Sequence, residues 1–352
     1  MTPTPHIQAW VYPGPPSCSA STELADGRTI DTLKPGYYNL SDTGALTQIT
    51  SGCNSYSAAN AALIKAHSKQ QFVTISGSIA GITALNTSKA LMTTSTSILV
   101  AFLTTTGFTG VEWDIEGFSD WTPAQYGDYK AVMAAMGQVL HTHGFQLMID
   151  GPAIINPTYQ GYYLNFRYED FEKLPIDKIV IMCYDFQNDN GNGTPVATLS
   201  DLTGCCQWMK PRISDPGRVV IGVNSYGYHG ETSGPAAYTS TADTYQQSTK
   251  YPGFSTARRD ASSGEMLWSS GDKSYSYSDS TTLNLKVQTV LSAGYSQISI
   301  WHLGGGNAYP TQSAQSPALS PTPEVATPSE STLTAFHAAY PNFAQWYQDN
   351  LA

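Results

Sequence analysis

The sequence predicts an α/β protein built as a (β/α)8 TIM barrel, with a small β-containing insertion after strand seven. Short β-branched or aromatic runs alternate with longer segments of helical periodicity, and this alternation is typical of βαβ units around a parallel sheet. Eight such runs are present, which is the number that closes the barrel. Because α/β barrels routinely reach 352 residues as one unit, we expect a single catalytic domain over residues 1–352.

The predicted strands are enriched in residues that favour β structure and are flanked by turn-forming residues. In chain order they are His6–Tyr12, Tyr37–Leu40, Gln71–Ser76, Gly110–Glu116, Phe145–Ile149, Lys178–Tyr184, Arg218–Ser225 and Gln297–Trp301. Asp42-Thr43-Gly44 is a candidate hairpin turn after the second strand. Apolar residues at helical spacing predict the intervening helices, which are Ala58–Ser68, Thr94–Thr105, Pro123–His143, Tyr168–Leu174, Ala197–Ile213, Thr281–Ser292 and Ser331–Asn350.

Two stretches interrupt this alternation. Residues 228–280 are rich in Gly, Ser, Thr and Tyr and contain strand-like patches at Glu265–Trp268 and Lys273–Tyr277. We expect them to form the insertion, as a wall beside the active site. Residues 309–330 are rich in Pro, Ser and Thr, and we expect a surface loop that carries the last helix back onto the barrel.

The composition excludes some classes of partner and favours one compartment. Charged residues make up 12% of the chain, about half the usual share of about 25%. A net charge of −10 and only 17 Lys and Arg, with no basic run, argue against a nucleic acid partner. No apolar stretch reaches the length of about 18 residues that a membrane span needs. We expect a secreted, extracellular monomer from composition alone, since the start of the sequence has no signal peptide pattern.

The cysteines and histidines suggest no metal or redox site. The five cysteines include no CxxC pair, so neither a zinc ribbon nor a thioredoxin motif is supported. Cys18 and Cys53 lie in loops near the N-terminus, where we expect a disulfide between them. Cys183 lies in an apolar strand-like run, and we expect an inert buried thiol. Seven histidines without HExxH spacing argue against catalytic zinc, and we expect no metal and no other cofactor.

The most informative segment is the fourth predicted strand. Side chains of a strand alternate between its faces, so this strand points three apolar side chains toward the helices and three carboxyl groups into the barrel, namely Val111, Trp113 and Ile115, and Glu112, Asp114 and Glu116. Neither burial nor like-charge proximity favours ionisation of all three acids. A core selected for stability alone would not contain such a row, so we infer a catalytic role.

The row of three acids can be explained if the acids differ in their protonation states. We expect the deeper pair, Glu112 and Asp114, to share a proton, and Glu116 at the strand end to have a raised pKa and stay protonated near neutral pH. A protonated carboxylic acid in this position is what glycoside cleavage requires. The alternative is an acid cluster that binds a metal or pairs with arginines, but Arg is scarce here and metal ligands usually converge from several elements.

The segment Thr109–Glu116, T-G-V-E-W-D-I-E, resembles the signature D-G-x-D-x-D-x-E of glycoside hydrolase family 18, the chitinase family. The resemblance implies that Glu116 is the proton donor and that Asp114 orients the acetamido group of the substrate. Thr109 and Glu112 stand where the family has aspartate. Because Glu112 keeps the carboxyl but adds a methylene, the resemblance leaves the pH profile open.

Further matches come in the order of the family. Met182-Cys183-Tyr184-Asp185 resembles M-x-Y-D, in which the Tyr hydroxyl and the Asp position the N-acetyl group. Gly222–Gly227, which contains Tyr226, is similar to G-x-P-x-Y-G, and Thr74–Gly77 is a looser match to S-x-G-G. Trp301 matches the tryptophan under the sugar to be cleaved. Trp301 and Tyr184 could instead be barrel core, and Trp10 and Tyr12 are either core or a sugar platform.

The resemblance implies a retaining, endo-type hydrolase of β-1,4-linked N-acetylglucosamine polymers, with chitin or chitooligosaccharides as substrate. The family's reaction is substrate-assisted: Glu116 protonates the glycosidic oxygen while the substrate's acetamide, held by Asp114 and Tyr184, attacks the anomeric carbon. Two alternatives remain. One is an endo-β-N-acetylglucosaminidase acting on N-glycans or peptidoglycan, and the other is a non-catalytic chitinase-like lectin, against which the retention of Glu116 argues.

Overall fold

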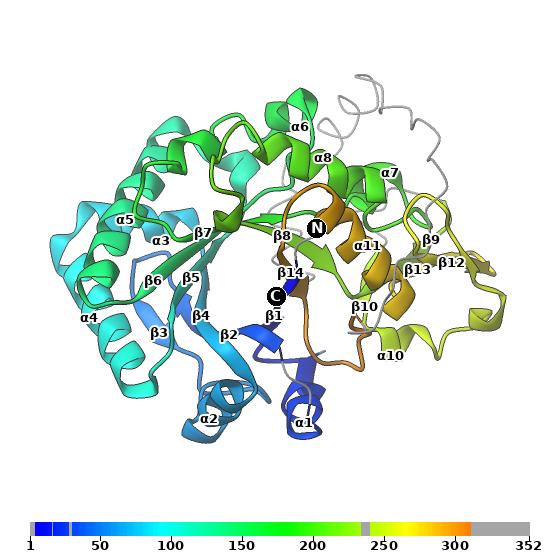
Figure 1. Cartoon of the computed structure of the whole chain (residues 1–352), viewed down its shortest axis with the longest axis horizontal. Coiled ribbons are helices and arrows are strands. Elements are labelled where there is room, and N and C mark those ends of the chain that lie inside the picture. The colour runs from blue at the N-terminus through cyan, green and yellow to red at the C-terminus, as the bar shows by residue number, and fades with distance from the viewer. Residues whose placement is uncertain (1–3, 16, 28–29, 234–239, 311–352) are drawn as a thin grey trace.

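A closed barrel of eight parallel strands forms the body of the molecule (Figure 1). The computed structural model describes residues 4–15, 17–27, 30–233 and 240–310. The barrel strands are β1 (His6–Val11), β2 (Ile30–Leu40), β4 (Ser68–Gly77), β5 (Gly110–Ile115), β6 (Gln146–Gly151), β7 (Lys178–Met182), β8 (Val219–Asn224) and β14 (Gln297–Trp301). Strand β1 pairs in parallel with both β14 and β2 and so closes the barrel. The predicted fold class is confirmed.

The helices lie outside this barrel, between successive strands (Figure 1). They are α1 (Ala20–Ala25), α2 (Ala58–Ala66), α3 (Ile79–Thr87), α4 (Lys89–Thr106), α5 (Pro123–Thr142), α6 (Pro157–Tyr162), α7 (Gln187–Asn190), α8 (Leu199–Met209), α10 (Tyr245–Ser248) and α11 (Ser280–Ser292). Short 3-10 helices occur at Ser17–Ser19, Phe118–Asp120, Tyr168–Phe171, Pro216–Arg218 and Phe254–Thr256. None of the helices in the described ranges combines the length and the apolarity needed to cross a bilayer.

Local sequence signals explain where these helices begin and end. Before α5, the Thr122 hydroxyl accepts a hydrogen bond from the Gln125 amide, and the Gln125 side chain accepts one from the Thr122 amide. This capping box satisfies N–H groups that have no partner within the helix. Helix α4 ends at Gly107, whose φ of 67° lies in the left-handed region that glycine adopts at low cost.

Several elements of the structure differ from those predicted. Strand β2 begins at Ile30, seven positions before the predicted Tyr37, because Lys34-Pro35-Gly36 resembles a loop although it lies within the strand. The predicted helix at Tyr168–Leu174 is only the 3-10 turn Tyr168–Phe171. Helix α3 was missed, whereas the candidate hairpin is confirmed: β2 pairs antiparallel with β3 (Leu46–Gln48).

The insertion after the seventh barrel strand is a five-stranded antiparallel sheet at one side of the barrel (Figure 1). Its strands are β9 (Gly227–Glu231), β10 (Thr241–Asp243), β11 (Arg258–Arg259), β12 (Met266–Ser270) and β13 (Lys273–Tyr277). A fully buried ion pair joins it to the barrel layer, since Lys286 Nζ of α11 lies 2.6 Å from Glu265 Oε1. The Val196 and Ala197 amides also donate to Glu265. The charge of Glu265 is thus fully compensated.

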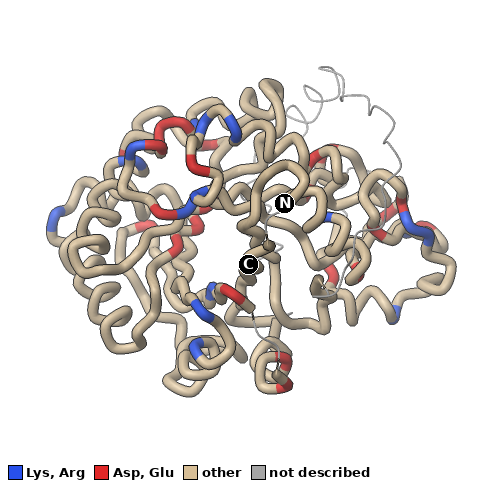
Figure 2. The backbone as a smooth tube through the Cα atoms, viewed as in Figure 1, with Lys and Arg blue, Asp and Glu red and all other residues tan. Residues whose placement is uncertain are grey.

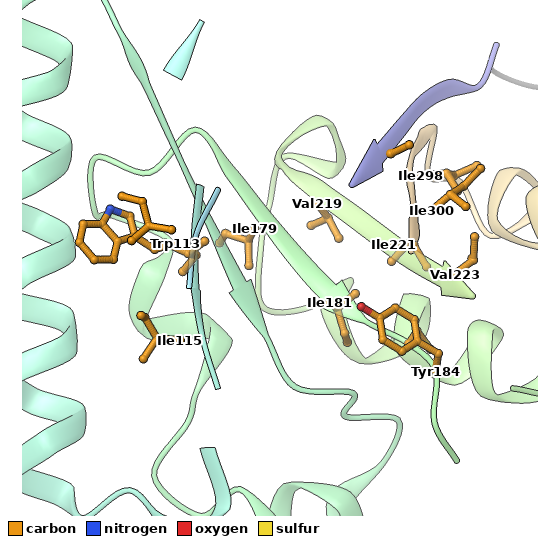
Figure 3. Packing of buried hydrophobic residues seen from close by; sticks show 14 of the residues in the cluster. Trp113, Ile115, Ile179, Ile181, Tyr184, Val219, Ile221, Val223, Ile298 and Ile300 are labelled. Carbon is orange, nitrogen blue, oxygen red and sulfur yellow. The ribbon is translucent and has the colours of Figure 1, made fainter. Parts of the chain in front are cut away.

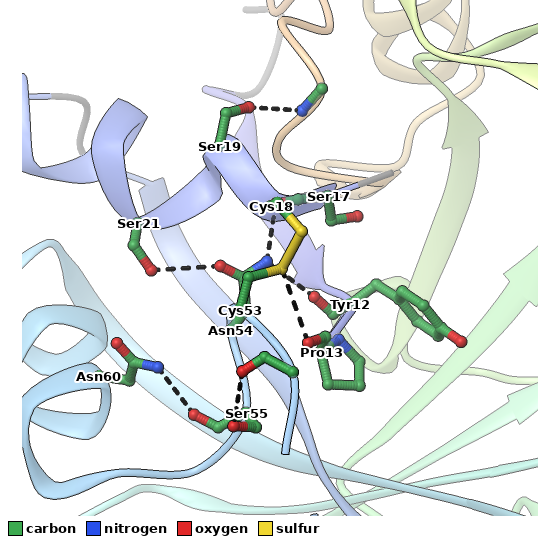
Figure 4. The surroundings of a disulfide bond; sticks show 12 residues. Tyr12, Pro13, Ser17, Cys18, Ser19, Ser21, Cys53, Asn54, Ser55 and Asn60 are labelled. Carbon is green, nitrogen blue, oxygen red and sulfur yellow. Dashed lines mark hydrogen bonds between the residues drawn. A yellow bond between two sulfur atoms is a disulfide. The ribbon is translucent and has the colours of Figure 1, made fainter. Parts of the chain in front are cut away.

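Two disulfides tie loops to the barrel. Cys18 and Cys53 are bonded as predicted, and Figure 4 shows this bond next to Pro13 and Asn54. Cys183 is bonded to Cys205 of α8, so the prediction of an inert buried thiol at Cys183 is wrong. The bond connects the segment after β7 to a helix outside the barrel. Within the described residues, Cys206 is the one free cysteine, and it is buried.

The main core lies between the barrel strands and the helices. Apolar side chains from alternate strand positions fill it, including Ile179, Ile181, Ile221 and Ile298 (Figure 3). A smaller cluster lies on the inner side of the barrel and contains Trp10, Phe72, Met148, Val180 and Val220. Charged residues are sparse along the part of the backbone that the structure describes (Figure 2). The predicted helix Ser331–Asn350 and nearly all of the loop 309–330 lie outside the described residues.

Candidate active site

Strand β5 presents its side chains as the alternation predicts. Val111, Trp113 and Ile115 are fully buried in the core between strands and helices, and Figure 3 shows Trp113 beside the helical layer. The acids at the intervening positions therefore lie on the inner side of the barrel. Strand β5 ends at Ile115, so Glu116 is the first residue beyond its C-terminal end, which is the end of a parallel barrel where catalytic groups are found.

Glu112 is the deepest of the three acids and is fully buried. Its Oε1 lies 2.5 Å from Lys34 Nζ, while its Oε2 accepts hydrogen bonds from Trp10 Nε1 at 2.9 Å and from Thr74 Oγ1 at 2.5 Å. The Lys34 ammonium also lies 3.2 Å from the centroid of a Trp10 ring. These contacts stabilise the ionised carboxylate.

The expected sharing of a proton between Glu112 and Asp114 stays a prediction. Both oxygens of Glu112 receive donors, namely Lys34 on Oε1 and Trp10 and Thr74 on Oε2. Asp114 Oδ1 is buried and has no hydrogen-bond partner within the described residues. Burial, followed by the charge of Glu112, raises the pKa of Asp114 to about 7, against a lowering effect of Lys34.

Glu116 has the electrostatic surroundings of a general acid. Burial, and then the charges of Asp114 and Asp185, raise the pKa of Glu116 well above its usual value. This agrees with the expectation of a protonated carboxyl near neutral pH. The main chain at this residue is fixed from outside the strand, because Trp121 Nε1 donates to the Glu116 carbonyl oxygen at 3.2 Å.

The segment after β7 brings a second set of polar groups to the same end of the barrel. Tyr184 is 8% exposed, and burial, followed by the charges of Glu116 and Asp185, raises the pKa of Tyr184 well above its usual value. Asp185 has a φ of 70°, a left-handed conformation that is uncommon outside glycine and often occurs at functional sites. Its Oδ1 accepts hydrogen bonds from the hydroxyls of Tyr226 and Tyr228, and burial raises the pKa of Asp185 to about 6.

Aromatic residues from the first and last barrel strands lie next to one another. Trp301, at the end of β14, is partly exposed and makes edge contacts with Trp10 and Tyr12, with ring centroids 5.6 and 6.2 Å apart. Trp10 is buried and bonded to Glu112, so it is part of the barrel interior rather than an open platform. Tyr12 and Trp301 keep exposed surface. Met182, at the end of β7, is partly buried beside the core.

Three residues of this region were missed from the sequence. Lys34 and Asp150 are fully buried on inner strand positions, and Tyr228 of the insertion contacts Asp185. A lysine in an apolar strand was a usable signal for Lys34, but the predicted strand started too late. Asp150 directly follows the predicted end of its strand, and a carboxylate at the C-terminal end of a barrel strand is a signal for a functional residue. No sequence signal marked Tyr228.

The arrangement suits proton transfer to a bound substrate. It combines the Glu116 carboxyl, whose pKa is raised well above its usual value, the Asp114 carboxyl, whose pKa is raised to about 7, and the Tyr184 hydroxyl. Among the described residues, no group of three or more His, Cys, Asp or Glu side chains is placed to hold a metal ion. The chemistry that these residues offer is general acid and base catalysis with charge stabilisation.

Comparisons with known proteins point to one family. The sequence matches the family model of glycosyl hydrolases family 18 over residues 37–306. None of the curated proteins compared with the chain matches it. Among solved structures, a chitinase from Chromobacterium violaceum is similar with a TM-score of 0.70 and 16% identity, covering 86% of this chain and 95% of that one.

Two further structures have the same fold. A class V chitinase from Pseudomonas fluorescens gives a TM-score of 0.68 at 19% identity, covering 87% of this chain and 97% of that chain. The spore cortex-lytic enzyme SleL from Bacillus megaterium gives 0.69 at 13% identity, covering 86% of this chain and 72% of that chain. At such identities these likenesses show the fold alone.

Proposed function

The chain belongs to family 18 of the glycosyl hydrolases and is a glycosidase; from this premise we propose that it hydrolyses β-1,4-linked N-acetylglucosamine polymers, chitin and chitooligosaccharides, in an endo fashion. The observation that carries the proposal is the position of the Glu116 carboxyl, partly buried and directly after the C-terminal end of β5. Burial and the charges of Asp114 and Asp185 raise the pKa of Glu116, so the group still has a proton to donate at neutral pH.

In the proposed reaction Glu116 protonates the glycosidic oxygen, and the substrate's own acetamide oxygen attacks the anomeric carbon from the opposite face. The bond between that carbon and the leaving oxygen breaks, and positive charge spreads over the resulting oxazolinium ion. Ionised Asp114 stabilises this charge and accepts the acetamide N–H, while the Tyr184 hydroxyl donates to the acetamide oxygen. Glu116, now a carboxylate, takes a proton from the incoming water, and the configuration at the anomeric carbon is retained.

The remaining residues hold the sugar in this proposal. Trp301 supports the face of the ring to be cleaved, because aromatic faces pack well against apolar sugar faces. Asp185 and Tyr226, which are hydrogen-bonded to each other, make polar contacts with the acetamido group. Met182 and Tyr12 complete the surroundings. The wall beside the site is supported by Tyr228 of the insertion, which contacts Asp185.

A second candidate substrate is peptidoglycan, because spore cortex-lytic enzymes are among the similar structures. Its N-acetylglucosamine residues carry the same 2-acetamido group, and so do N-glycan cores, so the proposed chemistry applies to all three.

The row of acids with Glu116 intact supports an enzyme rather than a lectin of the same fold. We also propose secretion of a monomer: disulfides persist in oxidising compartments, and two are formed here.

The proposal is tested with two fluorogenic disaccharides that differ in the 2-substituent, a chitobioside and a cellobioside. We expect hydrolysis of the chitobioside alone, because the cellobioside lacks the attacking acetamide. Comparable hydrolysis of the cellobioside would mean that a protein side chain is the nucleophile, and the substrate-assisted account would fail. Release of soluble products from colloidal chitin, a glycoprotein and cell wall then identifies the polymer.

A further inference from the structure

Asp150 is a buried acid that the proposed reaction does not use. It follows Met148 by two positions on β6, and Met148 belongs to the cluster on the inner side of the barrel. Asp150 therefore lies on the same inner face. It is 0% exposed, and neither of its carboxyl oxygens receives a hydrogen bond from any N–H or O–H group of the described residues. An ionised carboxylate without donors in such a position is very costly.

One partner of Asp150 is another carboxyl group. Strand β6 pairs in parallel with β5, which carries Glu112, and the side chains of Asp150 and Glu112 interact by a hydrogen bond. Two carboxyl groups can form a hydrogen bond only when one of them carries a proton, since an ionised carboxylate only accepts. Glu112 already accepts from Lys34, Trp10 and Thr74, so the proton belongs to Asp150.

We propose that Asp150 is a neutral carboxylic acid that donates a hydrogen bond to Glu112 and acts as a positioning residue that allows Asp114 to ionise at neutral pH. The proposal deepens the proposed function and rests on it. The other titratable groups whose charges act on Asp150, or on which Asp150 acts, are Lys34 of β2, Asp114 of β5, Tyr129 of α5, and Tyr168 and Tyr184.

The electrostatics of the inner acids agree with this assignment. Burial and the charge of Glu112 raise the pKa of Asp150 well above its usual value, against a lowering effect of Lys34. With Asp150 neutral and Glu112 paired with Lys34, the charge that faces Asp114 is limited, and the pKa of Asp114 is about 7. A charge on Asp150 would raise it further. Asp114 would then stay protonated at neutral pH and could not stabilise the positive charge of the reaction.

The test is a pH titration by carbon NMR of the full chain, without substrate, labelled with 13C at the aspartate side-chain carboxyl groups. Asp150→Asn and Asp114→Asn assign the two resonances, and Asp26→Asn, an exposed aspartate, is the matched control. We expect the Asp150 resonance to stay at the protonated position throughout the ordinary range of carboxyl titration and at neutral pH. The midpoint of Asp114 should change by less than about 0.3 units in Asp150→Asn, because one neutral group replaces another.

Two results would overturn the proposal: an Asp150 resonance that titrates in the ordinary carboxyl range, or a midpoint of Asp114 that falls by about 1 unit or more in Asp150→Asn, as removal of a like charge demands. Asp150→Leu adds a kinetic readout. Asp150→Leu removes the hydrogen-bond donor to Glu112, so the charge of Glu112 acts more strongly on Asp114. The acid limb of the pH profile of kcat/KM should therefore move to higher pH in Asp150→Leu. In Asp150→Asn the acid limb should lie where it does in the unsubstituted enzyme.

A merely structural role would lower kcat/KM by the same factor at every pH, and that outcome counts against the proposal. If Asp150→Leu does not fold, the NMR midpoint of Asp114 in Asp150→Asn, compared with that in the unsubstituted chain, still tests the proposal. Failure of the proposed function is distinguishable, because it would appear as absence of chitobioside hydrolysis in the unsubstituted enzyme while the NMR result stands unchanged.

Discussion

Lys34 Nζ lies 2.5 Å from Glu112 Oε1 inside the barrel, and both side chains are fully buried. This pair distinguishes Glu112, whose charge has a partner, from the other inner acids. Lys34 compensates the charge of Glu112, so the remaining proton equilibria belong to Asp114, Asp150 and Glu116. Because a buried pair of this kind often adds little net stability compared with apolar residues, its position beneath the candidate acid favours a role in setting protonation states.

The pair gives a first prediction, on stability. Lys34→Met should lower the free energy of unfolding by about 3–5 kcal/mol, because it leaves Glu112 buried without its cation. Lys34→Met combined with Glu112→Gln should recover most of the loss, since the amide is neutral and its oxygen still accepts from Trp10 and Thr74. Urea unfolding measures both variants.

Lys69→Met is the control for this prediction. The side chain of Lys69 is 81% exposed and pairs with Asp31, so its removal should leave the free energy of unfolding close to that of the unsubstituted chain. A double variant no more stable than Lys34→Met would show that the loss comes from packing rather than from an unpaired charge.

A second prediction concerns pH. The reaction needs ionised Asp114 and protonated Glu116, and the pKa values of Asp114 and Asp185 are raised to about 7 and about 6. kcat/KM should therefore rise with pH through about 6 to 7 and fall only at higher pH, where Glu116 loses its proton. A profile already flat between about pH 4 and about pH 6 would contradict the assignment of Asp114.

The same raised pKa values determine a trend in stability. At a pH between the usual aspartate pKa of 3.8 and the raised pKa values of about 7 and about 6, Asp114 and Asp185 bind more protons in the folded than in the unfolded state. Their contribution is therefore fully present at low pH and is lost as the pH rises to about 7. In Asp185→Asn the free energy of unfolding should fall less over this window than in the unsubstituted chain.

A third prediction follows from the bond between Cys183 and Cys205, which are 22 residues apart. Replacing both with alanine should lower the free energy of unfolding by about 3 kcal/mol, since the bond restricts the unfolded chain. Cys206→Ala removes a buried thiol without breaking a bond and corrects for lost packing. Alkylation of the unfolded, unreduced chain should modify Cys206 alone, and three modified cysteines would contradict the bond.

The barrel could be predicted from the sequence because its signal is repeated and local. Most barrel strands are short and β-rich, and the alternation in β5 alone was sufficient to place Trp113 outward and Glu112 inward. The antiparallel insertion was also recognisable, and Lys273–Tyr277 matches β13 to the residue. Boundaries failed where local propensity conflicts with tertiary structure, as at Lys34-Pro35-Gly36, which the barrel holds extended against its turn-forming tendency.

The partners of the acids could not be predicted. Lys34 reaches Glu112 across 78 positions of sequence, and only the closed sheet brings them together. Cys183 was misjudged for the same reason, because its partner Cys205 lies on a helix whose position depends on packing. The identities of the residues on β5 indicated proton-transfer chemistry, but their charge states depend on neighbours from other strands.

The central claim is that Glu116 supplies the proton that cleaves the glycosidic bond, and the kinetics of Glu116→Gln on a chitooligosaccharide test it most directly. The amide is nearly isosteric but cannot donate a mobile proton, so kcat should fall by about 10²- to 10⁴-fold while the Kd for the oligosaccharide stays close to that of the unsubstituted enzyme. Asp120→Asn, an exposed acid four positions away, should keep full activity. A Glu116→Gln enzyme that turns over at a rate similar to Asp120→Asn would contradict the account.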